Sequence, residues 1–165
     1  MLDLLIEAAD WSRIPLEQLA EKATRATLEH LGRPVEQSSI SLMACDDDRI
    51  GILNATFREK PTPTNVLSWP SDELGAGEDG KTPRDPIPDF DGTYELGDIA
   101  IAYETCAREA AELGKSLEDH VTHLIVHGIL HLLGYDHVRD RDAALMQALE
   151  VEILGKLGLD DPYRI

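Results

Sequence analysis

The segment HGILHLLGYDH, residues 127–137, constrains the fold more than any other part of the chain. His127 and His131 are four positions apart in an otherwise apolar stretch, so a helix places both side chains on one face, one turn apart. Gly134 follows three residues later, where helices commonly end with a residue at positive φ. A chain reversal after this glycine would bring His137 back towards the other two histidines. The sequence therefore predicts a helix with three histidines gathered at its C-terminal end.

Three histidines that converge in this way can bind zinc, whose bonds to imidazole nitrogen are about 2 Å long. We expect one Zn²⁺ per chain, with His127, His131 and His137 as its ligands. Three protein ligands leave the fourth tetrahedral position for water, which is typical of catalytic zinc sites. His123 lies one turn before the first ligand, and we expect it to support the ligands or to pack in the core rather than bind the ion. Asp136 either orients a ligand imidazole or faces solvent.

The spacing HxxxHxxGxxH also matches the metzincin metalloproteases, which makes a peptidase an alternative function. In those enzymes a glutamate follows the first histidine and acts as the general base. Here that position is Gly128, which has no side chain to transfer a proton. A glycine inside a helix costs about 1 kcal/mol relative to alanine, so we expect substrate or backbone to approach closely at this point. The peptidase is therefore the less favoured alternative.

Strands and helices are mixed along the chain without strict alternation. We expect strands over residues 2–8, 39–45, 66–69 and 97–103, and helices over residues 15–31, 49–57, 104–113, 117–133 and 140–157. Residues 71–92 carry seven acids, three prolines and four glycines, which favours a solvated loop without secondary structure. The predicted fold is a single α+β domain over residues 1–165, with a small mixed sheet backed by helices and a zinc site at the C-terminal end of a central helix.

Charge and cysteine content limit the partners and the location. The net charge of −17 argues against broad, non-specific binding of nucleic acid, which requires Lys and Arg to neutralise phosphates. Residues 51–70 carry a local charge of +1 and residues 120–141 a charge of zero, so a neutral-to-basic cleft could still accept a polyanion. No apolar run approaches the roughly 18 residues that a membrane span needs. Cys45 and Cys106 form no CxxC pair, and we expect reduced thiols in a cytoplasmic protein.

A second unusual segment is NATFREKPTPTNVLSWP, residues 54–70, in which Arg58 precedes a rigid Pro/Thr loop. Arginine presents a planar fork that suits phosphate oxygens. Together with HGILHLLGYDH and ELGDIAIAYE (residues 95–104), this segment resembles the YbeY family, bacterial rRNA maturation factors described as single-strand-specific endoribonucleases. The resemblance runs from about residue 39 to residue 155.

The resemblance implies that the three motif histidines, His127, His131 and His137, bind zinc and that Arg58 is essential for catalysis. It implies action on single-stranded RNA in rRNA 3′-end maturation, ribosome assembly and ribosome quality control. The expected partners are rRNA, a small-subunit ribosomal protein and a ribosome-associated GTPase. We expect zinc to lower the pKa of its bound water towards about 7 and Arg58 to stabilise the charge that develops on the phosphate. A non-catalytic ribosome assembly factor with a structural zinc remains the main alternative, because an acidic body suits docking to basic ribosomal proteins.

Overall fold

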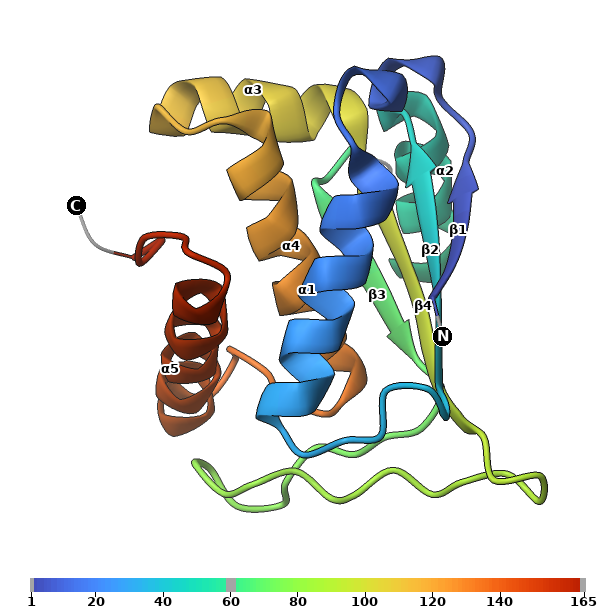
Figure 1. The fold of residues 1–165 in the computed structure, drawn as a ribbon, viewed down its shortest axis with the longest axis vertical. Coiled ribbons are helices and arrows are strands. Elements are labelled where there is room, and N and C mark those ends of the chain that lie inside the picture. Colours follow the sequence, from blue (N-terminus) through green and yellow to red (C-terminus); the bar gives the residue numbers. More distant parts are fainter. Residues whose placement is uncertain (1, 59–61, 164–165) are drawn as a thin grey trace.

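A four-stranded mixed sheet with helices on both faces organises the fold (Figure 1). This computed structural model describes residues 2–58 and 62–163, and the side chains of Phe57 and Arg58 lie outside that description. The strands are β1 (Leu2–Ile6), β2 (Ser38–Cys45), β3 (Val66–Pro70) and β4 (Tyr94–Ala102). The helices are η1 (Ala9–Arg13, 3-10), α1 (Leu16–His30), α2 (Asp47–Arg58), α3 (Tyr103–Leu113), α4 (Leu117–Leu132) and α5 (Asp140–Lys156).

The sheet has the strand order β1-β2-β4-β3. The first three strands in this order are parallel to one another, and β3 pairs with β4 in the antiparallel direction at the edge. Because β1 and β2 are parallel neighbours, the chain must cross over between them, and α1 forms that crossover. The combination of parallel and antiparallel pairs with packed helices confirms the predicted α+β class.

The main core lies between the sheet and the layer formed by α1 and α4, with α5 packed beyond them (Figure 1). Alternate residues of β2 and β4 point into this core, among them Leu42, Ile99 and Ile101. Ten of the sixteen residues of α4 are buried, as expected for a helix that is apolar on almost every side. The two histidines at positions 127 and 131 are therefore carried by a helix that is largely buried.

A smaller core lies on the opposite face of the sheet, under α2. The intervening residues of the same strands point to this side, because successive side chains in a strand alternate between faces. Cys45 and Ala100 meet Ile50 of α2 there. Both cysteines of the chain are buried and free. Within residues 2–58 and 62–163, no helix is long and apolar enough to cross a membrane.

The predicted elements match the observed ones to within one residue at all but three of their ends, and the short helix η1 was not predicted. The first strand ends at Ile6 instead of residue 8. The last strand begins at Tyr94 instead of residue 97, because the chain continues in strand conformation through Gly97 at φ 139°. This glycine is required, since a Cβ atom at this position would collide with the carbonyl oxygen of Trp69 on β3. Helix α2 begins two residues earlier than expected, at Asp47, whose carboxylate accepts a hydrogen bond from the hydroxyl of Thr105 at 2.8 Å.

Residues 71–92 form neither helix nor strand, as predicted, but they are docked against the start of α5. The carboxylate of Asp79 accepts the backbone N–H of Asp142 at 2.8 Å, and the Asp142 carboxylate accepts the N–H of Gly80 at 2.8 Å. The Arg139 guanidinium donates to two backbone carbonyl groups of the loop at 2.8 and 2.9 Å. Helix α5 receives no cap from its own N-cap side chain, so this loop supplies the acceptors that its first turn needs.

Candidate metal centre

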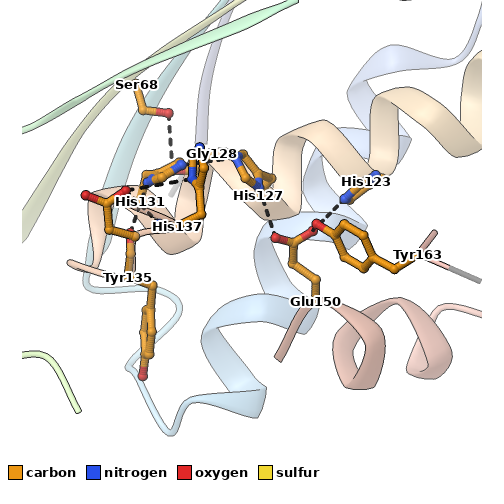
Figure 2. A network of polar contacts seen from close by, with 10 residues as sticks. Ser68, His123, His127, Gly128, His131, Tyr135, His137, Glu150 and Tyr163 are labelled. Carbon is orange, nitrogen blue, oxygen red and sulfur yellow. Dashed lines mark hydrogen bonds and ion pairs between the residues drawn. The ribbon is translucent and has the colours of Figure 1, made fainter. Parts of the chain in front are cut away.

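His127 and His131 lie on one face of α4 with their rings turned towards each other (Figure 2). Their Nε2 atoms are 3.0 Å apart, and the ring centroids are separated by 4.5 Å. The helix that carries them begins at Leu117, and the hydroxyl of its N-cap residue Ser116 accepts the backbone N–H of Asp119 at 3.1 Å. The sequence spacing therefore placed these two side chains correctly.

The outer nitrogen of each ring has its own partner, and these partners fix where the protons lie. His131 Nδ1 is 3.0 Å from the carbonyl oxygen of Tyr135, which can only accept, so this nitrogen carries the proton. His127 Nδ1 is 2.9 Å from a carboxylate oxygen of Glu150 and donates to it. Both Nε2 atoms are consequently free to present lone pairs to the space between the rings. Two lone pairs directed at one point in this way suit a shared metal ion.

Gly134 turns the chain so that the third histidine returns to the first two. Its φ is 99°, and the N–H of the next residue, Tyr135, bonds to the carbonyl of Leu130 at 3.0 Å, which closes the helix end. The ring of His137 lies 5.4 Å from that of His127 and 5.1 Å from that of His131, measured between centroids. The structure thus brings the three histidines into one cluster, with a nitrogen of each within 4.8 Å of the others.

The cluster fits a zinc ion. Bonds of about 2.0–2.1 Å in tetrahedral geometry place ligand nitrogens roughly 3.3 Å apart, close to the 3.0 Å between the two Nε2 atoms. Burial, and then the neighbouring rings of His127 and His137, lower the pKa of His131 to about 4. This ring is therefore neutral near pH 7, which is the form that binds a metal. His137 is exposed, so the cluster opens to solvent on its side.

Glu150 on α5 is a site residue that the sequence reasoning missed. Its side chain is 1% exposed, and its carboxylate contacts His123, His127 and Tyr163. Burial alone would raise the pKa of Glu150, but the hydrogen bonds from these three groups outweigh burial and lower it to about 2. The signal in the sequence was an acid on the buried stripe of the last helix, one turn after Met146.

The two residues assigned to supporting roles lie on different sides of the cluster. His123 Nε2 is 2.5 Å from the second carboxylate oxygen of Glu150, so it reaches the ligands only through that carboxylate. Asp136 accepts the backbone N–H of His137 at 2.7 Å and lies 3.7 Å from Nδ1 of that ring. Both placements are compatible with the supporting roles predicted for these residues, which stay predictions.

Gly128 is buried against the sheet and does not face the histidine cluster. A Cβ atom here would lie 3.1 Å from Cδ1 of Ile99 and 3.2 Å from the hydroxyl of Ser68. The sequence predicted that substrate or backbone would approach closely at Gly128. In the structure, two side chains of the sheet make this close approach instead. The residue that a metzincin would use as its base therefore points into the packed interface between α4 and the sheet.

The side chain of Arg58 lies outside the described residues, so the structure does not place the predicted catalytic group. Its backbone ends α2, on the face of the sheet opposite α4. Polar contacts fix the chain on both sides of this position: Asn54 donates to the carbonyl of Thr62 at 2.9 Å, and Asn65 donates to Glu109 at 2.9 Å. Residues 59–61, the start of the Pro/Thr loop, also lie outside the described residues.

A groove of about 530 Å³ runs beside the histidine cluster, between residues 72–76 and the segment that follows α4. His131 and Tyr135 form part of its wall. Its charged lining consists of Asp72, Glu73, Asp136, Asp142, Arg84 and Arg139. Residues 120–141 carry no net charge by themselves, but the acidic loop 71–92 folds next to them. The groove therefore has more acidic than basic side chains in its wall, in contrast to the neutral-to-basic cleft that the sequence predicted.

Comparison with known proteins identifies the family. The family model described as Endoribonuclease YbeY matches residues 6–158. The protein named Endoribonuclease YbeY in Ruegeria pomeroyi is 60% identical to this chain, over 98% of this chain and 97% of that protein. The protein of the same name in Cereibacter sphaeroides is 52% identical, over 99% of this chain and 98% of that protein. The solution structure of TM1509 from Thermotoga maritima has the same fold, with a TM-score of 0.57 at 23% identity and full coverage of both chains. The chain belongs to the Endoribonuclease YbeY family.

Proposed function

We propose that residues 1–165 form one zinc-dependent domain that acts as a single-strand-specific endoribonuclease in rRNA 3′-end maturation. The relatives' shared name, Endoribonuclease, supports cleavage of RNA phosphodiester bonds by this chain. One observation carries the metal dependence: two half-buried imidazoles turn their Nε2 lone pairs towards each other at 3.0 Å, with a third histidine beside them. Neutral nitrogen ligands in this number suit a zinc ion that keeps one position for solvent or substrate.

The proposed division of labour follows from the residues. His127, His131 and His137 would hold one ion, and Glu150 and Tyr135 keep the first two rings in the tautomer that binds it. When bound, zinc supplies a Lewis acid that polarises a phosphoryl oxygen and acidifies water. Arg58 would present its planar guanidinium to the phosphate and stabilise the negative charge that develops there.

A cleavage assay with purified protein tests this function. The substrates are a labelled single-stranded RNA, the same sequence as a duplex, and a peptide, each with zinc, with a chelator, and with zinc restored. We expect cleavage of the single strand only, lost with the chelator and recovered with zinc. Cleavage that continues in the chelator would contradict metal dependence, and hydrolysis of the peptide alone would favour the metzincin alternative. The buried position of Gly128 gives that alternative no support.

Two substitutions separate the roles within the site. Arg58→Ala should abolish RNA cleavage and leave zinc content at one ion per chain. Arg49→Ala on the same helix is the matched control, because this arginine is exposed and forms an ion pair with Glu7 at 3.4 Å. His131→Ala should lose the ion itself. Normal cleavage by the Arg58 variant would refute its assignment, and stoichiometric zinc in the His131 variant would refute the ligand set.

A non-catalytic role in ribosome assembly remains the second candidate. The net charge of −17 and the acidic groove beside the histidines favour it, since both suit a basic protein partner better than RNA alone. Both functions share the expected partners, which are a small-subunit ribosomal protein and a ribosome-associated GTPase. Both also share a cytoplasmic location, and the two free cysteines support this location. A zinc-loaded protein that binds ribosomal protein but cleaves no RNA would decide for assembly.

A further inference from the structure

A buried carboxylate with three hydrogen-bond donors lies directly behind the histidine cluster (Figure 2). Glu150 is 0% exposed as a residue, which is unusual for an acid without a strong partner. Among the described residues, its ion-pair partners are His123 and His127, and neither lysine nor arginine reaches it. Its negative charge is therefore balanced only by groups that belong to, or touch, the proposed metal site.

The contact with His127 has a direct consequence for the opposite side of that ring. When Nδ1–H donates to Oε1 of Glu150 at 2.9 Å, the ring cannot flip or change tautomer without losing this hydrogen bond to a buried carboxylate oxygen. Nε2 then stays directed at Nε2 of His131. A negative charge on the far side of an imidazole also raises the basicity of its metal-binding nitrogen.

The C-terminal segment completes this arrangement. Tyr163 lies beyond α5, and its hydroxyl donates to the Glu150 carboxylate at 2.6 Å. Its ring packs edge-on against His123, with 5.8 Å between centroids and 87° between planes. A turn in which the backbone N–H of Tyr163 bonds to Asp161 at 2.8 Å holds the segment in this position. The carboxylate is thereby fixed from two sides, by the C-terminal segment and by α4.

We propose that Glu150 is a positioning residue that sets the metal affinity of the histidine cluster, and that Tyr163 holds Glu150 in place. The inference rests on the proposed metal site at His127, which it deepens. Glu150 acts through His127 and touches neither substrate nor ion. The C-terminal segment accordingly contributes to the strength of metal binding, although it lies outside the histidine motif.

Zinc affinity, measured by competition with a chelator of known affinity, tests the proposal. Glu150→Gln removes the charge at nearly constant volume and should weaken binding by about 10- to 100-fold, the usual effect of losing such a partner. Tyr163→Phe keeps the ring on His123, removes one hydrogen bond, and should weaken binding by roughly 3- to 10-fold. Glu152→Gln is the matched control, since Glu152 is on the same helix, more than half exposed, and bonded to His30 at 2.8 Å away from the cluster. It should bind zinc within about 2-fold of the parent protein.

A second readout separates positioning from a purely structural role. Unfolding temperatures are measured for each protein with and without zinc. If Glu150 only stabilised the fold, Glu150→Gln would lower both temperatures equally and leave the zinc-induced rise unchanged. The proposal predicts a smaller rise for Glu150→Gln and Tyr163→Phe, because stabilisation by a ligand falls as its dissociation constant increases. The absorption spectrum of the cobalt-substituted protein should also change in Glu150→Gln and stay unchanged in Glu152→Gln.

Unchanged zinc affinity in Glu150→Gln would overturn the proposal. If that variant does not fold, unchanged affinity in Tyr163→Phe would overturn it instead. Binding of two zinc ions per chain, with the second lost in Glu150→Gln, would also overturn it, because Glu150 would then be a ligand. His131→Ala separates a failure of the proposed metal site from a failure of the positioning role. If His131→Ala keeps its zinc, the proposed metal site is wrong. If His131→Ala loses its zinc and Glu150→Gln binds zinc as tightly as the parent protein, only the positioning role of Glu150 is wrong.

Discussion

Gly134 ends α4 and determines the path of the chain to His137, so its replacement tests how the site is built. Gly134→Ala has two separate costs. A φ of 99° is strained for any residue with a Cβ atom, which costs about 1–2 kcal/mol. The new Cβ would also lie 2.8 Å from the backbone carbon of Leu74 and 2.9 Å from its oxygen. Overpacking against backbone costs about 1–3 kcal/mol, so the total is about 2–5 kcal/mol.

Gly158→Ala is a control that carries the first cost without the second. Both glycines stand two residues after the end of their helices, and in both cases the next N–H bonds five residues back, Tyr135 to Leu130 and Leu159 to Leu154. Gly158 has φ 80°, but a Cβ atom there would meet nothing within 4 Å. We expect it to cost about 1–2 kcal/mol.

Thermal unfolding of both variants in a chelator measures the difference without any contribution from zinc. For a chain of this length, about 2–4 °C of unfolding temperature corresponds to 1 kcal/mol. Gly158→Ala should therefore lose about 2–8 °C and Gly134→Ala about 4–20 °C. Any replacement of glycine also reduces the entropy of the unfolded chain, but this gain is the same in both variants and cancels in the comparison. Equal losses would refute the reasoning, because the contact with Leu74 would then cost nothing.

Three further outcomes follow from the structure. Asp79→Ala should lower the free energy of unfolding by about 0.5–2 kcal/mol in a urea titration, because α5 loses the carboxylate that caps it. An unchanged free energy of unfolding would show that the loop does not stabilise the helix. Burial raises the pKa of Cys45 to about 12 and also raises the pKa of Cys106. Neither thiol should therefore react with an aromatic disulfide at pH 8 until the protein is denatured. Fast reaction of the folded protein would contradict the buried positions of the two thiols. At a free zinc concentration of about 100 times the dissociation constant, zinc should stabilise the protein by about 2.7 kcal/mol. Its removal should therefore lower the unfolding temperature by about 5–11 °C, and the same treatment should leave the unfolding temperature of His131→Ala unchanged.

Local patterns in the sequence determined most of the secondary structure and the nucleus of the site. The four-residue spacing of His127 and His131 places both rings on one helical face in any tertiary context, because the helical repeat alone decides it. Gly134 predicted both the helix end and the return of His137, since a positive φ at that point is a local requirement. The start of the same helix was also predicted correctly, at residue 117.

Tertiary structure alone decided what surrounds those histidines. Glu150 is 23 residues from His127, and no local rule indicates that an acid on the last helix will meet a ring on α4. In the sequence, Gly128 indicated that the glutamate general base of a metzincin is absent. Only the tertiary structure showed that this position faces Ile99 and the sheet. The acidic loop 71–92 was correctly expected to lack secondary structure, and yet its docking on α5 was not foreseeable. Helical spacing is fixed by backbone geometry within a few residues, whereas these contacts depend on how distant elements pack, and the sequence encodes that packing only collectively.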